Sequence, residues 1–159
     1  MFNLDQFRSQ VVQTALDKLN LYSKSAEQLL ILTCAQETQG GTFIKQVDGP
    51  ALGIFQMEPK THEDLWATFL PRRSDLVYRL LQAVHLSTKP PADCLQYNLL
   101  YAAMMCRLKY FFIKDPLPEA DDIKGMSIYW HKFYNCNPNV NPQDAVIAYN
   151  RFMGLKKPK

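Results

Sequence analysis

The sequence predicts a mainly α-helical protein with one short irregular β-region. Apolar residues recur at helical spacing in six or seven separate segments. Between residues 42 and 57 this spacing disappears, and the turn-forming pair Asp48-Gly49 is followed at once by Pro50, which weakens any second strand. At 159 residues the chain is long enough for one domain with a sizeable core. We therefore expect six to seven helices around a groove, with the irregular segment as one lip.

Capping and breaking residues bound the predicted helices. Ser25 and Gln28 match a capping box that opens the second helix, and Gly40-Gly41 end it as a glycine C-cap. Ser74 caps a later helix, and Asn141-Pro142 begin the last one. The expected helices cover residues 5–19, 25–37, 59–70, 74–84, 93–112, 119–133 and 142–153.

Glu37 is the first candidate for chemistry. It lies in the last turn of the second predicted helix, shortly after the apolar run 29–32. The negative end of the helix dipole disfavours a carboxylate there, and apolar surroundings disfavour its charged form. Both effects raise the pKa of Glu37 and hold a proton on it near neutral pH, as a general acid requires. The alternative is an exposed glutamate at a frayed helix end.

Two strings in the chain match a known pair of motifs. They are Glu37-Thr38-Gln39-Gly40-Gly41 and Gly53-Ile54-Phe55-Gln56-Met57, and they begin 16 residues apart. In this order and spacing they resemble two motifs of the goose-type lysozyme and soluble lytic transglycosylase superfamily. The continuation through Glu58-Pro59 to Thr61-His62 and Trp66 is similar to the version found in bacteriophages. The resemblance is strongest from Cys34 to Trp66 and thinner after Tyr97.

The resemblance implies a lysozyme-like, α+β version of the fold. It implies a single domain over residues 1–159, with a catalytic core at about 25–153. It also implies cleavage of the β-1,4 bond between N-acetylmuramic acid and N-acetylglucosamine in peptidoglycan. In that reaction Glu37 is the general acid and base, and Gln56 lines the sugar groove near it.

The number of catalytic carboxylates distinguishes the two reactions that can cleave this bond. A lytic transglycosylase manages with one acid, because the 6-hydroxyl of the sugar attacks and a 1,6-anhydro product forms. A hydrolase of the muramidase type adds a second carboxylate. The available second carboxylates are Asp48, Glu58, Glu63 and Asp64, and no motif singles one out. We therefore expect a transglycosylase.

Other substrate-binding residues are predicted from the second half of the chain. The aromatic stretch 129–135 suits sugar binding, and within it we assign Tyr134 and Asn135 to the groove and Trp130 to the core together with Phe133. The pair Tyr149-Asn150 belongs to an Ala-Tyr-Asn string similar to the transglycosylases' last motif, and it competes for the same role.

Thr38 and His62 complete the predicted substrate-binding set. Thr38 replaces the serine of the family motif and keeps a hydroxyl group, while His62 follows Gln56 by six residues. His62-Glu63 is not part of an H-E-x-x-H motif, and the four cysteines show no CxxC spacing, so we expect no metal site and no cofactor. Cys34 and Cys106 fall in apolar helical runs and are predicted to be buried free thiols.

Charge and hydropathy bear on partners and location. The net charge of +3, part of it from the tail 156–159, suits a glycan strand of the cell wall but is too small to indicate nucleic acid. No apolar run reaches the length of about 18 residues that a membrane span needs. The N-terminus lacks the basic and apolar regions of a signal peptide. We therefore expect synthesis in a host cytoplasm and action in the periplasm or cell wall.

Two biological settings agree with these expectations. The protein acts as a phage endolysin, or it is a virion component that opens the wall and has other phage virion proteins as partners. The rival interpretation is a non-enzymatic lysozyme-like structural component of a phage particle, because fold similarity does not guarantee chemistry.

Overall fold

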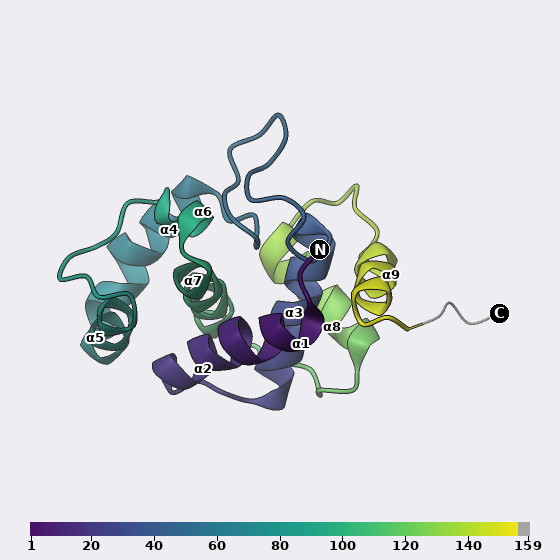
Figure 1. Ribbon diagram of the computed structural model, residues 1–159, viewed down its shortest axis with the longest axis horizontal. Helices are drawn as coiled ribbons and strands as arrows, with labels where there is room; N and C mark the ends of the chain where they lie inside the picture. The colour runs from purple at the N-terminus through teal and green to yellow at the C-terminus, as the bar shows by residue number, and fades with distance from the viewer. Residues whose placement is uncertain (156–159) are drawn as a thin grey trace.

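The computed structural model describes residues 1–155 and is mainly helical, as the sequence predicts (Figure 1). The basic tail 156–159 lies outside the described residues. Elements labelled η are π-helical or 3-10 turns. The helical elements are α1 Leu4–Gln6, η1 Phe7–Gln13, α2 Thr14–Leu19, α3 Lys24–Thr38, α4 Pro59–Asp64, η2 Leu65–Phe69, η3 Leu70–Arg72, α5 Ser74–Ala83, α6 Cys94–Tyr97, α7 Leu99–Phe111, α8 Ile123–Trp130, η4 His131–Asn135 and α9 Pro142–Phe152.

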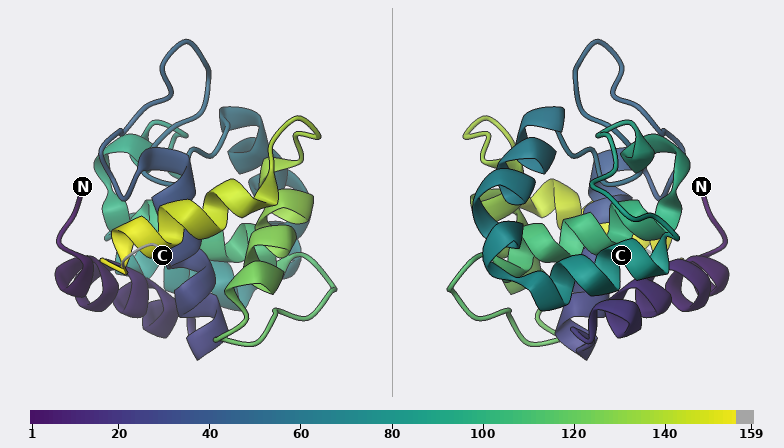
Figure 2. Two further views of the ribbon diagram at one scale, coloured as in Figure 1. Left: turned by 90° about the vertical axis from the view of Figure 1, so that its right-hand side faces the viewer. Right: turned by 90° about the vertical axis from the view of Figure 1, so that its left-hand side faces the viewer.

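Two helices, α3 and α7, form the centre of the fold. The stretches 29–35 in α3 and 101–108 in α7 are buried on every side, which marks helices surrounded by protein rather than by solvent. Figure 2 shows α9 crossing α3 on one face of the molecule, and α8 and α9 pack together there. On the other face α2 and α5 pack against α7 and against each other.

Segment 42–57 joins these helices without regular strand. Its first part projects beyond the helices as a long loop (Figure 1). Within residues 1–155 the only β-type pairings are two isolated antiparallel bridges, Lys45 to Leu52 and Leu52 to Met57. The loop closes through the Gln46 N–H, which donates to the Ala51 carbonyl at 2.9 Å. This segment is therefore irregular, as predicted.

Five predicted helix ends differ from the structure. Gln39, not Gly40-Gly41, is the left-handed C-cap of α3. Ser74 is the first residue of α5, and the N-cap Arg73 makes no side-chain capping hydrogen bond.

The other three differences are at helix starts. Ser23, not Ser25, caps α3, because its hydroxyl accepts a hydrogen bond from the Ala26 N–H at 3.0 Å. The continuous helix expected over 93–112 is broken at Asn98, whose side chain caps α7. The helix expected to begin at residue 119 begins at Ile123. These three starts are set by local side-chain caps (Ser23, Asn98 and Asp122) that satisfy free backbone N–H groups.

The cysteines and the hydropathy of the helices agree with a compact helical domain. All four cysteines are free, and Cys34 and Cys106 are buried, as predicted. Burial raises the pKa of the Cys34 thiol to about 12, so the thiol stays protonated and unreactive at neutral pH. None of the helices formed by residues 1–155 combines the length and apolarity needed to cross a membrane.

A buried carboxylate joins the first two helical segments. Glu27 in α3 is fully buried and accepts hydrogen bonds from Lys24 (2.6 Å), Gln13 (3.0 Å) and Tyr22 (3.0 Å). Arg8 forms a further ion pair with it at 3.4 Å. Burial by itself raises the pKa of Glu27, but these donors outweigh burial and hold the pKa below its ordinary value.

Replacing this carboxylate tests its contribution to stability. Because the pKa is depressed in the folded state, the stabilisation is present above the unfolded pKa of about 4.3 and is lost as the pH falls through the folded value. Glu27→Gln is expected to lower the free energy of unfolding at pH 7 by about 1–3 kcal/mol, with a smaller loss below about pH 4. Urea unfolding at both pH values measures this, with the exposed Glu119→Gln as control. An equal loss at both pH values would contradict the ionic role.

Candidate functional site

Glu37 lies in the last turn of α3 and lines a groove of about 590 Å³. A smaller depression of about 210 Å³ shares Glu37, Gln46 and Gln56 with this groove, so the three side chains lie where the two hollows meet. The groove is lined by Glu37, Gln46, Ala51, Gln56, Glu58, Thr61, Lys109, Phe133, Tyr134, Asn135, Cys136 and Asn137. Its walls therefore come from the end of α3, segment 42–57, α4, α7 and η4.

The carboxyl group of Glu37 is tuned towards protonation. Burial raises its pKa to about 7, although the Trp130 hydrogen bond and the positive charge of Lys109 both act to lower it. The indole Nε1 of Trp130 donates to Oε1 of Glu37 at 2.9 Å. The raised pKa that the sequence predicted for Glu37 is thus confirmed, with burial as its main cause. Trp130 is fully buried, as predicted, but its hydrogen bond to Glu37 was not foreseen.

Gln56 reaches the groove because of an unusual backbone path. Its own backbone is left-handed, with a φ of 48°, and its Nε2 donates to the Gly53 carbonyl at 2.9 Å. Gly53 has a φ of +74°, and a Cβ there would lie 2.0 Å from the Leu95 carbonyl oxygen of α6. Only glycine fits such a close approach between two backbones. Gly53 therefore fixes the turn that presents Gln56 beside Glu37.

Thr38 does not line the groove, which corrects its predicted role as a substrate-binding residue. Its side chain is fully buried. The hydroxyl donates to the Ile54 carbonyl oxygen at 2.8 Å and accepts from the Gly41 N–H at 3.1 Å. Thr38 therefore ties the end of α3 to segment 52–57. The hydroxyl that this position shares with the family motif acts on the backbone, not on a ligand.

His62 is a second correction. Its ring is fully buried, and Nε2 lies 2.6 Å from the hydroxyl oxygen of Tyr101, which also accepts a hydrogen bond from Trp66. The other ring nitrogen lies 3.2 Å from Glu63. Burial lowers the pKa of His62 and so favours the neutral ring. His62 therefore joins α4 to α7 and does not face the groove.

Tyr134 and Asn135 both line the groove, but Tyr134 is almost fully buried. Its hydroxyl donates to the Phe55 carbonyl at 2.7 Å, so it is already used inside the protein. The competing pair lies elsewhere: Tyr149 is buried and its hydroxyl donates to Gln28 at 2.8 Å, while Asn150 lines a different cavity. Phe133, which we expected in the core, is partly buried against the core and also lines the groove.

The four candidates for a second carboxylate differ in whether they line the groove. Glu58 lines the same groove as Glu37. Asp48 is exposed on the projecting loop and lines neither hollow, and Glu63 and Asp64 are exposed on α4, where Glu63 pairs with Lys89. Of the four carboxylates considered as a second acidic group, only Glu58 therefore shares a groove with Glu37.

Gln46 and Lys109 are among the groove residues that sequence reasoning missed. Gln46 has no distinguishing pattern around it. Lys109 does have one, because it lies four and eight residues after Met105 and Tyr101, which are both fully buried on α7. A lysine on the same stripe as two core residues is unusual, because its charge has to reach a polar environment.

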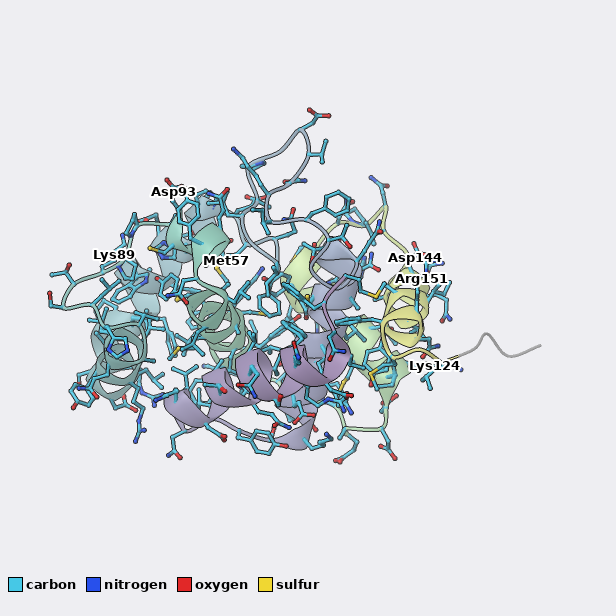
Figure 3. The ribbon with its side chains drawn as sticks, viewed as in Figure 1. Met57, Lys89, Asp93, Lys124, Asp144 and Arg151 are labelled. Carbon is cyan, nitrogen blue, oxygen red and sulfur yellow. The ribbon has the colours of Figure 1, made fainter. Side chains whose placement is uncertain are left out.

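A larger cavity of about 690 Å³ lies between α8 and α9, where Lys124 and Arg151 flank a mainly apolar lining (Figure 3). Of the residues considered for substrate binding or as the acid, only Asn150, from the competing Tyr149-Asn150 pair, lines it. Among residues 1–155 no group of three or more histidine, cysteine, aspartate or glutamate side chains is placed to hold a metal ion. Comparisons of the chain with protein-family models, curated proteins and solved structures found no match.

The close approach at Gly53 can be tested against a second left-handed glycine. Gly53→Ala is expected to lower the free energy of unfolding by about 2–4 kcal/mol, the sum of a left-handed alanine and a clash with the α6 backbone. Gly154 has a similar φ of +68°, but a Cβ added there would meet no atom within 4 Å. Gly154→Ala should therefore cost only about 1–2 kcal/mol. Equal losses in urea unfolding would disprove the packing role of Gly53.

The hydrogen bond from Trp130 can be tested by titration. A donor to a carboxylate favours its charged form, so Trp130→Phe should raise the pKa of Glu37 above its value of about 7. A rise of about one pH unit is expected, because a hydrogen bond to a charged group contributes about 1.5 kcal/mol. Carbon-13 NMR of labelled glutamate carboxyls measures it. The control Trp66→Phe, which removes a donor to Tyr101, should leave the Glu37 titration unchanged.

Proposed function

We propose that this protein cleaves the glycan strands of peptidoglycan as a lytic transglycosylase, with Glu37 as its general acid and base. One observation carries the proposal: a carboxyl group with a pKa of about 7 lines an open groove. Such a group is protonated in about half of the molecules at neutral pH, which suits proton transfer in both directions. The two motifs around Glu37 and Gln56 support the lysozyme-like fold and the peptidoglycan substrate, which are parts of the same proposal.

The proposed reaction needs one carboxyl group in two successive roles. Protonated Glu37 gives its proton to the glycosidic oxygen as the bond between that oxygen and C1 of N-acetylmuramic acid breaks. The oxygen of the C6 hydroxyl then bonds to C1, and its proton passes to the Glu37 carboxylate. The products are a 1,6-anhydro sugar and a strand with a free 4-hydroxyl. No water is consumed, and Glu37 regains its proton.

Other groove residues suit the binding of a sugar strand. The amides of Gln56, Gln46 and Asn135 line the hollow near Glu37, and amide groups both donate and accept hydrogen bonds with hydroxyl and acetamido groups. Phe133 and Tyr134 are aromatic residues of the same wall. In the smaller depression Phe43 and Val47 continue this mixed lining past Glu37. A strand can therefore extend to both sides of the acid.

Hydrolysis is the second candidate reaction, and the position of Glu58 favours it over any use of Asp48. In hydrolysis a water molecule attacks C1, and a second carboxylate activates that water or stabilises the positive centre. Glu58 is the acidic residue that shares the groove with Glu37. A muramidase of this kind would use Glu37 as the acid and Glu58 as the second carboxylate.

The non-enzymatic alternative makes no use of the raised pKa of Glu37. A structural component of a phage particle has no need of a neutral carboxyl in an open groove, where burial of that group is unfavourable for stability. The proposed setting is therefore an active wall-cleaving protein, either a free endolysin or a virion component. It acts on the wall from the periplasmic side or from the particle.

Digestion of purified peptidoglycan tests the proposal. Wild-type protein should release muropeptides one water lighter than hydrolytic products, as read by mass spectrometry. Glu37→Gln keeps the shape of the side chain but cannot donate the proton, so release should fall by about 10²–10⁴-fold. Glu58→Gln should retain most of the activity if the transglycosylase reaction is correct.

Two matched results would change the assignment. Hydrated products whose release is lost in Glu58→Gln, and not in Asp48→Asn, would establish the hydrolase. Equal and negligible release by wild type and Glu37→Gln on several wall types would favour the structural component. Circular dichroism of each variant separates loss of function from loss of fold.

A further inference from the structure

Lys109 is a groove residue whose charge the proposed reaction leaves unused. It lies near the end of α7 and lines the groove together with Glu37 and Glu58. Its Nζ donates to the Tyr134 carbonyl oxygen at 2.9 Å and lies 3.8 Å from the centroid of the Tyr134 ring. The carbonyl and the ring face hold the ammonium group at the groove wall by a hydrogen bond and a cation–π contact.

The ammonium group has donors to spare. It carries three N–H groups, and the Tyr134 carbonyl is its only hydrogen-bond acceptor among residues 1–155. None of the ion pairs formed by the described residues includes Lys109. Burial lowers its pKa, which shows that the charge is partly removed from water without full compensation. An anion entering the groove would supply the missing partner.

The protein's own carboxylates do not fill this role. Glu37 and Glu58 line the same groove and influence Lys109 through their charges, but neither lies within ion-pair distance of Nζ. At neutral pH Glu37 is also protonated in about half of the molecules. The cation therefore remains available to a ligand that lies along the groove.

We propose that Lys109 recognises a carboxylate substituent on the glycan strand, next to the bond that Glu37 cleaves. This inference rests on the proposed function and names the strand's chemical class: an amino-sugar polymer with acidic side groups, such as the lactyl carboxylate of muramic acid. A neutral strand of N-acetylglucosamine alone has no group that pairs with this ammonium. Lys109 thus favours strands from which stem peptides have been removed, because an attached peptide converts the lactyl carboxylate into a neutral amide.

Binding to two forms of one ligand tests this. Glycan strands freed of peptides by an amidase carry free lactyl carboxylates, and conversion to methyl amides makes them neutral. Titration calorimetry with the Glu37→Gln protein, which does not cleave, should show about tenfold tighter binding of the charged strands, because a charge-assisted hydrogen bond contributes about 1.5 kcal/mol or more. Adding Lys109→Met should reduce this ratio to about one.

Three further variants in the Glu37→Gln background make the result specific. Lys109→Arg keeps the cation and should keep the preference, whereas Lys109→Gln keeps a donor to Tyr134 without the charge and should lose it. Lys132→Met is the matched control. Lys132 also lies over an aromatic ring, 4.6 Å from the Phe133 centroid, but it is exposed and pairs with Asp115, so its loss should leave the preference unchanged.

The outcomes separate this inference from the proposed function. If folded proteins with and without Lys109 prefer charged strands to the same degree, the role proposed for Lys109 is overturned. The proposed function is not affected by that result. That role is also overturned if wild type cleaves peptidoglycan but binds charged and neutral strands equally well. If wild type neither binds strands nor releases muropeptides, the proposed function fails, and this inference fails with it.

Discussion

The site depends on how the backbone of segment 52–57 is held against three helices. Thr38 at the end of α3 donates to the Ile54 carbonyl, and Tyr134 in η4 donates to the next carbonyl, that of Phe55. On the other side, Gly53 lies in direct contact with the α6 backbone. Buried carbonyl groups need such partners, because an unpaired one is destabilising by about 1–3 kcal/mol. The same bonds that satisfy this irregular segment also place Gln56 beside Glu37.

Two glutamates of the same helix show how surroundings set the pKa. Glu27 at the start of α3 has three hydrogen-bond donors and a further cation around it, and its pKa is lowered. Glu37 at the end of α3 has one indole donor, and burial raises its pKa to about 7. The first group is thus an ionic contact that stabilises the fold. The second faces a groove and is protonated in about half of the molecules at neutral pH, which favours proton transfer over stability.

Some of the residues predicted to bind substrate line the groove, and others are buried inside the protein. Gln56 and Asn135 line the groove, whereas Thr38 and His62 are buried in hydrogen bonds that join structural elements. A hydroxyl or imidazole in a motif looks the same in sequence whether it binds a ligand or a neighbouring carbonyl. Only its burial and its partner separate the two roles. Lys109 was not predicted to bind substrate, yet it lines the groove. The sequence shows a lysine on the same helix stripe as core residues, but it does not show that this lysine lies in the groove.

Local sequence patterns were enough to predict most of the helices, the irregular segment 42–57 and the position of Glu37 in a last helical turn, because these follow from periodicity and capping. They also indicated that the pKa of Glu37 is raised. The packing of the chain decided that Trp130, 93 residues further along, donates to Glu37, and that Glu58 and not Asp48 shares its groove. Those contacts join segments far apart in the chain. Their formation depends on how the helices pack around α3 and α7, which no local pattern specifies.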